Sequence, residues 1–102
     1  MFTNTRGAPR RQLTLPVSVR AGAHLGRVLD VSATGLRLEM HAADEVELPA
    51  TLTLHLGPSR VAVPVNVSWK RHGHRTWICG AAVSQEGDVE WRAFLATLEA
   101  DR

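Results

Sequence analysis

The 102-residue sequence is poor in several residue types, with one cysteine, no tyrosine, two phenylalanines and a single lysine among twelve basic residues. The lone Cys79 cannot form a disulfide within the chain, and its position in an apolar segment predicts a small buried hydrophobe. No apolar run approaches the roughly 20 residues that span a membrane, and the first residues contain no signal-peptide core. These absences predict a cytoplasmic protein that does not insert into a membrane.

Composition and charge are those of an ordinary globular domain. Hydrophobic residues make up 44% and charged residues 22% of the chain, so we expect one domain over residues 1–102. The net charge is +2, and the basic excess lies in the N-terminal third. A charge of this size is too small for a long nucleic-acid tract, which needs many phosphate contacts. We therefore expect no nucleic-acid polymer as a partner, and we expect any anionic partner to be small.

Six segments alternate apolar and polar residues with the period of a β-strand. They are residues 13–20, 25–31, 36–40, 51–56, 61–69 and 76–83. Turn-forming residues separate several of them, among them Gly22, Gly57 and Gly73. Short strands at this spacing with turns between them predict an all-β fold, an antiparallel barrel or sandwich, rather than alternating strands and helices.

The last segment changes to a helical period. Its apolar residues, spaced i, i+3, i+4 and i+7, are Trp91, Phe94, Leu95 and Leu98. This spacing predicts a helix over residues 88–101 with Asp88 as its N-cap. Because an isolated helix of this length is marginally stable, we expect its apolar face to lie across the barrel or a partner.

Two arginines, Arg6 and Arg10, precede the first predicted strand. Pro9 biases Ala8 toward extended backbone, so the two guanidinium groups lie up to roughly 13 Å apart, and Gly7 allows a tighter path. A guanidinium matches the O6/N7 edge of guanine bidentately, stacks on its face and pairs with phosphate oxygens. The pair can therefore embrace one flat anionic ligand, although spacing alone favours a flexible basic tail.

Asp30, Ser32 and Gly35 lie at the junction of the second and third predicted strands. Asp30 and Ser32 share a face because side chains alternate along a strand. A carboxylate accepts two hydrogen bonds and guanine presents two adjacent donors on its Watson–Crick edge, so Asp30 can bind the edge that an arginine cannot. Ser32 and the turn amides can bind phosphate, and we expect Gly35 to take a positive φ. An ordinary turn is the alternative, because these residue types also form turns for local reasons.

Together these two features resemble the signature of the PilZ domains, bacterial receptors of cyclic di-GMP. That signature is Arg-x-x-x-Arg followed by Asp/Asn-x-Ser-x-x-Gly, and both halves are present here in this order. The resemblance implies a six-stranded antiparallel β-barrel of split-barrel type with a C-terminal α-helix. It also implies that Arg6 and Arg10 clamp guanine and phosphate, while Asp30, Ser32 and Gly35 form the opposing surface.

The resemblance extends over nearly the whole chain, through a proline before the second arginine to the segments 15–17, 67–69 and 80–83. In the last of these, Gly80 is followed by two alanines where relatives often have an aromatic residue. The implied organisation is a flexible arginine segment over residues 1–12, a barrel over 13–84 and the helix. The implied function is a cyclic di-GMP-binding module that transmits binding to an unidentified effector protein.

Other functions have less support in the sequence. It contains no Gly-rich phosphate loop, no His-Glu-x-x-His motif and no nucleophile elbow, so we expect neither an enzyme nor a cofactor. His72 and His74 lack a nearby carboxylate or cysteine to complete a metal site, and we expect a solvated hairpin tip there. The remaining alternatives are a PilZ-like adaptor that binds no nucleotide and an oligonucleotide-binding barrel, which requires exposed aromatic platforms.

Two tryptophans and one arginine are each open to more than one interpretation. Trp69 and Trp91 can stack on a base, but their positions on apolar faces predict core residues. Arg37, beside the Asp30 turn, is either a contributor to the site or a strand surface charge.

Overall fold

The computed structural model describes residues 11–13, 16–42 and 50–100 of the chain. The strands in these ranges are β1 (Arg11–Gln12), β2 (Ser18–Ala21), β3 (His24–Ser32), β4 (Gly35–His41), β5 (Thr51–Leu56), β6 (Ser59–His72) and β7 (Thr76–Val83). A 3₁₀ turn, η1 (Gln85–Gly87), leads directly into the helix α1 (Asp88–Ala100). The bounds of β5 and β7 are those that the alternation predicts.

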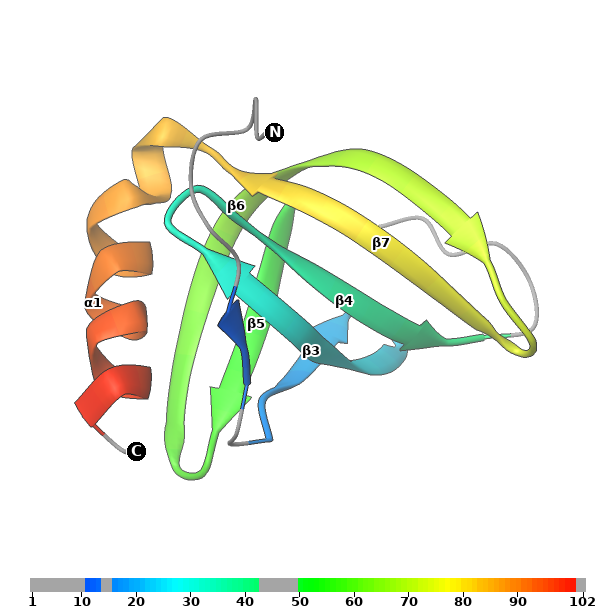
Figure 1. The fold of residues 1–102 in the computed structure, drawn as a ribbon, viewed down its shortest axis with the longest axis horizontal. Coiled ribbons are helices and arrows are strands. Elements are labelled where there is room, and N and C mark those ends of the chain that lie inside the picture. Colours follow the sequence, from blue (N-terminus) through cyan, green and yellow to red (C-terminus); the bar gives the residue numbers. More distant parts are fainter. Residues whose placement is uncertain (1–10, 14–15, 43–49, 101–102) are drawn as a thin grey trace.

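The six longer strands close into an antiparallel barrel. Their order is β3, β2, β5, β6, β7 and β4, and pairing of β4 with β3 completes the ring. Figure 1 shows α1 along one side of the barrel and the far end of the β6–β7 hairpin on the other side. The predicted fold class, an all-β six-stranded antiparallel barrel with a C-terminal helix, is therefore confirmed.

The first predicted strand differs from the structure. Alternation predicts one strand over residues 13–20, but β1 and β2 are separate strands that pair with different parts of β3. Pro16 lies between them and has no backbone N–H for a continuous ladder. One consequence is that Arg11 and Gln12, expected in the flexible segment 1–12, are residues of a strand paired with β3.

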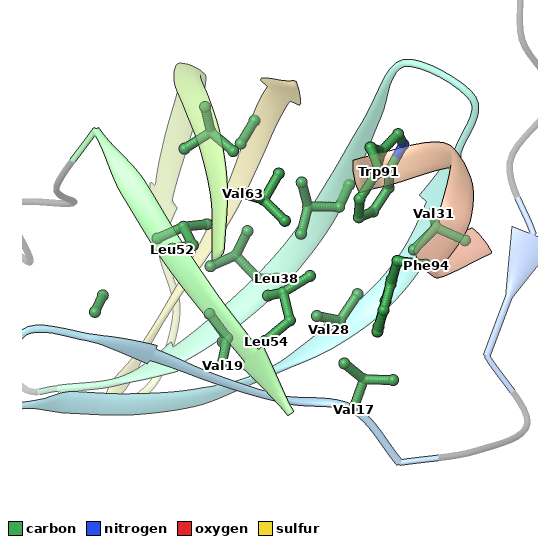
Figure 2. Close-up of a cluster of buried hydrophobic side chains, with 14 of the residues drawn as sticks. Val17, Val19, Val28, Val31, Leu38, Leu52, Leu54, Val63, Trp91 and Phe94 are labelled. Atoms are coloured by element: carbon green, nitrogen blue, oxygen red, sulfur yellow. The ribbon is translucent and has the colours of Figure 1, made fainter. Parts of the chain in front are cut away.

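Apolar side chains from all six barrel strands fill the interior, as Figure 2 shows for part of the cluster. The residues with no exposed surface in these strands are Val19, Leu36, Leu38, Met40, Leu52, Leu54, Val63 and Cys79. Cys79 is thus the buried hydrophobe that the sequence predicts. Burial raises the pKa of its thiol, while the positive charge of Lys70 acts in the opposite direction.

A β-bulge in β3 changes which side chains face outward. The register of β3 against β4 shifts between Val28 and Asp30, which makes Leu29 an extra residue. Strict alternation would put Asp30 on the inward face of Val28. Because of the bulge, Asp30 lies opposite Arg37 on the outer face, and Val31 returns to the core.

A second bulge lies in β6. Its register against β7 shifts between Val67 and Trp69, so Ser68 is the extra residue. The prediction that Trp69 is a core residue is wrong, because its side chain lies on the outer face and the residue is 39% exposed. Because of the bulge, the side chain of Trp69 lies on the face opposite to the one that the alternation of β6 predicts.

The helix follows the predicted spacing but starts differently. Its buried residues are Trp91, Phe94 and Leu98, with Leu95 partly buried. Asp88 is not an N-cap, because the preceding η1 turn already supplies helical backbone and Asp88 itself has φ −61° and ψ −40°. Asp88 instead pairs with Arg92 one turn later, at 3.0 Å. Within the described ranges, no helix is long and apolar enough to cross a membrane.

Trp91 ties the helix to the barrel. Its indole Nε1 donates a hydrogen bond to the carbonyl oxygen of Ser32 at 3.0 Å, and both residues are buried. Figure 2 shows Trp91 and Phe94 reaching from α1 toward the barrel side chains beside Val31. The helix is therefore joined by packing and by a hydrogen bond to the turn that follows β3.

Replacement of Trp91 tests this connection. Trp91→Phe keeps an aromatic ring but removes the donor to Ser32, so we expect the free energy of unfolding to fall by about 1–3 kcal/mol. Val89→Ala is the control on the same helix, because Val89 is 75% exposed, and it should change stability by at most about 0.5 kcal/mol. Urea unfolding measures both. A Trp91→Phe protein as stable as the parent would contradict a contribution from the hydrogen bond.

Candidate functional site

The turn between β3 and β4 brings together three of the predicted site residues. Asp30 and Ser32 lie on the outer face of β3 on either side of Val31, whose side chain is in the core. Ser32 lies opposite Gly35, the first residue of β4. The other two predicted residues, Arg6 and Arg10, lie outside the residues that the structure describes.

Ser32 organises this turn through local hydrogen bonds. Its Oγ accepts a hydrogen bond from the backbone N–H of Thr34 at 3.3 Å and donates to the carbonyl oxygen of Gly35 at 3.4 Å. Such side-chain bonds are typical of turns that begin with serine. The carbonyl of Thr34 also accepts a hydrogen bond from Val83 at the end of β7, at 2.9 Å. The turn is thus attached to β7 as well as to α1.

Gly35 is required for a different reason from the predicted one. We expect a positive φ there, but the described glycines with positive φ are Gly22 and Gly57. A Cβ on Gly35 would lie 2.5 Å from the backbone oxygen of Ala81 in β7. The expectation of a positive φ is therefore wrong, and Gly35 instead allows the close approach of β4 to β7.

Asp30 pairs with Arg37 across the strands. Both Nε and Nη2 of Arg37 contact Oδ2 of Asp30, and the Nε distance is 2.7 Å. The side chain of Asp30 is 3% exposed and that of Arg37 is 38% exposed. A buried carboxylate needs such charge-assisted hydrogen bonds. Alternation alone does not reveal the pair, because only the Leu29 bulge puts these residues opposite each other.

The strand register extends this site across the barrel surface. Trp69 in β6 lies opposite Gly80 in β7, Gly80 lies opposite Arg37 in β4, and Arg37 lies opposite Asp30 in β3. We call these four residues the outer row. Neighbouring strands are about 4.8 Å apart, so the outer row is about 14 Å long. A Cβ at Gly80 would overlap the indole of Trp69, which shows that the ring lies over this glycine.

A hollow of about 490 Å³ lies beside the Ser32 turn. It is lined by Ala33, Thr34, Val83, Ser84, Gln85, Asp88 and Arg92. These residues come from the turn, the end of β7, η1 and the start of α1. The hollow therefore borders the turn at Ala33 and Thr34, the two residues that follow Ser32.

The described residues contain no group of three or more His, Cys, Asp or Glu that could hold a metal ion. At the hairpin tip, the ring of His72 stacks on Trp77 with centroids 4.5 Å apart. His74 is exposed. The solvated tip is the interpretation that agrees with this arrangement.

Comparison with known proteins gives one family. A family model described as PilZ domain matches residues 4–97, a range that contains both arginines and the Ser32 turn. No curated protein matches the chain.

The environment of Asp30 leads to a prediction about stability. Arg37→Ala removes a partner from a buried carboxylate, so we expect the free energy of unfolding to fall by about 2–3 kcal/mol. Arg27→Ala is a matched control, because Arg27 pairs with Glu39 at 2.9 Å but is 63% exposed. That change should cost at most about 1 kcal/mol. Equal losses in urea unfolding would show that the Asp30 pair is energetically no different from a surface pair.

Proposed function

Because the chain belongs to the PilZ domain family, we propose that it is a cytoplasmic receptor for cyclic di-GMP that passes the binding signal to a partner protein. The observation that carries this proposal is the pair of buried polar residues Asp30 and Ser32 on the outer side of β3, at the start of a polar and aromatic outer row. The two predicted arginines, Arg6 and Arg10, precede this surface in the chain.

The ligand's functional groups match these side chains. The forks of Arg6 and Arg10 bind the O6/N7 edge of guanine and the phosphate oxygens. Asp30 accepts hydrogen bonds from the N1 and N2 donors of guanine. Ser32 donates to phosphate once its hydroxyl turns away from the carbonyl oxygen of Gly35. Gly35 lies opposite Ser32 at the start of β4 and lets that strand approach β7 closely.

Arg37 has a positioning role in this proposal. Its guanidinium holds the carboxylate of Asp30 on the outer face. Arg37 thus fixes the orientation of the Asp30 carboxylate.

Trp69 is predicted from the sequence to be a core residue, but it is exposed at one end of the outer row. Its indole lies over Gly80, which separates it from Arg37 in the row. An exposed tryptophan offers a face on which a base can stack.

Signal transmission follows from the N-terminal position of the arginines. Binding fixes the segment from Arg6 to Arg10 against the outer row, which changes the surface that a partner protein meets. Fixing a chain segment costs conformational entropy, so several charge-assisted hydrogen bonds must offset it. The loss of a single arginine should therefore weaken binding severely.

A second candidate function is an adaptor that binds a protein partner without a nucleotide. The observation that favours it is the ion pair between Asp30 and Arg37, which already supplies hydrogen bonds to the carboxylate. In that case the signature residues serve only the turn. A pull-down whose yield is the same with and without cyclic di-GMP, together with no heat of binding, would favour the adaptor.

Calorimetric titration of the protein with cyclic di-GMP, GTP and GMP tests the proposed ligand. We expect heat of binding with cyclic di-GMP and weaker or no binding of the mononucleotides. Arg10→Ala and Asp30→Ala should each weaken binding by about 10- to 100-fold, the loss of one charge-assisted hydrogen bond. Arg20→Ala is the control, because Arg20 is exposed on β2 and outside the outer row. Unchanged affinity in the first two variants contradicts the proposal.

The contribution of Trp69 is tested separately. Trp69→Ala should weaken cyclic di-GMP binding about tenfold through the loss of base stacking, and Trp69→Phe should retain most of the affinity. Val67→Ala is the matched control, because Val67 lies in the same strand, is 37% exposed and is not part of the outer row. If Trp69→Ala and Val67→Ala bind cyclic di-GMP equally well, Trp69 is not part of the nucleotide-binding surface.

A further inference from the structure

The β6–β7 hairpin carries a concentrated basic surface that the proposed nucleotide site does not use. Residues 70–75, here called the basic hairpin, contain Lys70, Arg71 and Arg75 together with two histidines. There is no acidic residue between Trp69 and Trp77. The whole chain carries +2, so the three formal charges of the basic hairpin exceed the net charge of the protein, and the remaining residues together carry −1.

The two arginines of the basic hairpin are presented to solvent. Both Arg71 and Arg75 are exposed. The guanidinium of Arg71 lies 5.9 Å from the centroid of the Trp69 ring. This cation–π contact does not neutralise the positive charge of the guanidinium. In the part of the chain that the structure describes, no carboxylate forms a salt bridge with either arginine. Their donors are therefore available to an external acceptor.

The backbone at the tip adds an independent observation. Arg75 has φ 64° in the tight turn closed by the hydrogen bond from Gly73 N–H to the carbonyl of Thr76. Glycine and asparagine adopt this left-handed conformation at lower cost than arginine. An arginine at a position that favours glycine or asparagine points to a function for its side chain.

The basic hairpin is remote from the Ser32 turn. Along β4, Gly35 lies at the turn and His41 lies opposite Thr76 at the hairpin. Six steps along a strand are about 20 Å, and Figure 1 shows the hairpin end on the opposite side of the molecule from α1. The tip of the hairpin is therefore distant from the Ser32 turn, although Arg71 at its base contacts Trp69, the last residue of the outer row.

We infer that the basic hairpin is a docking site for a short acidic segment of a partner protein. Carboxylates match arginine forks bidentately, and the two exposed arginines at one hairpin end fit a few acidic side chains. A membrane surface fits less well, because Gly73, His74 and Arg75 offer no large apolar side chain to insert. Nucleic acid also fits less well, because His72 stacks on Trp77 and the charge is small.

Binding of a short glutamate-rich peptide to the purified protein, followed by fluorescence anisotropy without nucleotide, tests this inference. Arg71→Glu/Arg75→Glu should weaken peptide binding by about tenfold or more, because attraction becomes repulsion. Arg20→Glu/Arg60→Glu has the same change in net charge at exposed positions outside the hairpin and should bind nearly as the parent does. Equal loss in both double variants, or no binding by the parent, overturns the inference.

Three further arms separate the alternatives. Arg75→Asn should weaken peptide binding while leaving the melting temperature unchanged or higher, whereas a lower melting temperature would make Arg75 a structural residue.

The acidic residues Asp44, Glu45 and Glu47 lie between β4 and β5 in the sequence. Their triple amide variant should bind the peptide at least as tightly as the parent, and weaker binding contradicts the inference. Tighter binding to phosphatidylglycerol vesicles or to single-stranded DNA than to the peptide also overturns it.

Discussion

Two extra residues, Leu29 in β3 and Ser68 in β6, determine the chemistry of the barrel surface. Without the first bulge, the carboxylate of Asp30 would face the apolar interior, where an unpaired charge costs several kcal/mol. Without the second bulge, Trp69 would also face inward. The bulges turn both side chains onto one face, and the outer row exists only because both are present.

The Ser32 turn connects this surface to the rest of the molecule. Its carbonyls accept hydrogen bonds from Trp91 of α1 and from Val83 of β7, and Gly35 lets β4 lie close against β7. The helix, the last strand and the turn therefore form one hydrogen-bonded unit at one end of the barrel. The basic hairpin lies at the other end of β4 and β7.

Strand and helix periods could be predicted from the sequence because burial imposes them on the pattern of apolar residues. The bulges could not, because one extra residue leaves no mark in composition, and the core assignment of Trp69 failed for this reason. The sequence does not decide whether Arg37 contributes to the site or is a surface charge, because its pairing with Asp30 depends on the register shift at Leu29. The start of α1 depends on the η1 turn before it, and the role of Gly35 depends on the backbone of β7 beside it. Neither is visible in the residues around those positions. The Arg6, Arg10 and Asp30 signature, in contrast, is a pattern of spacing and is visible without coordinates.

The central claim is that the two bulges assemble a single nucleotide-binding face from Asp30, Arg37, Gly80 and Trp69. A titration of ¹⁵N-labelled protein with cyclic di-GMP, followed by NMR chemical shifts, tests this most directly. The account predicts that the indole N–H signal of Trp69 and the amide signals of the other three residues shift together, while the exposed β2 residue Arg20 is unaffected. Shifts that leave the outer row unchanged, or no shifts at saturating ligand, would contradict it.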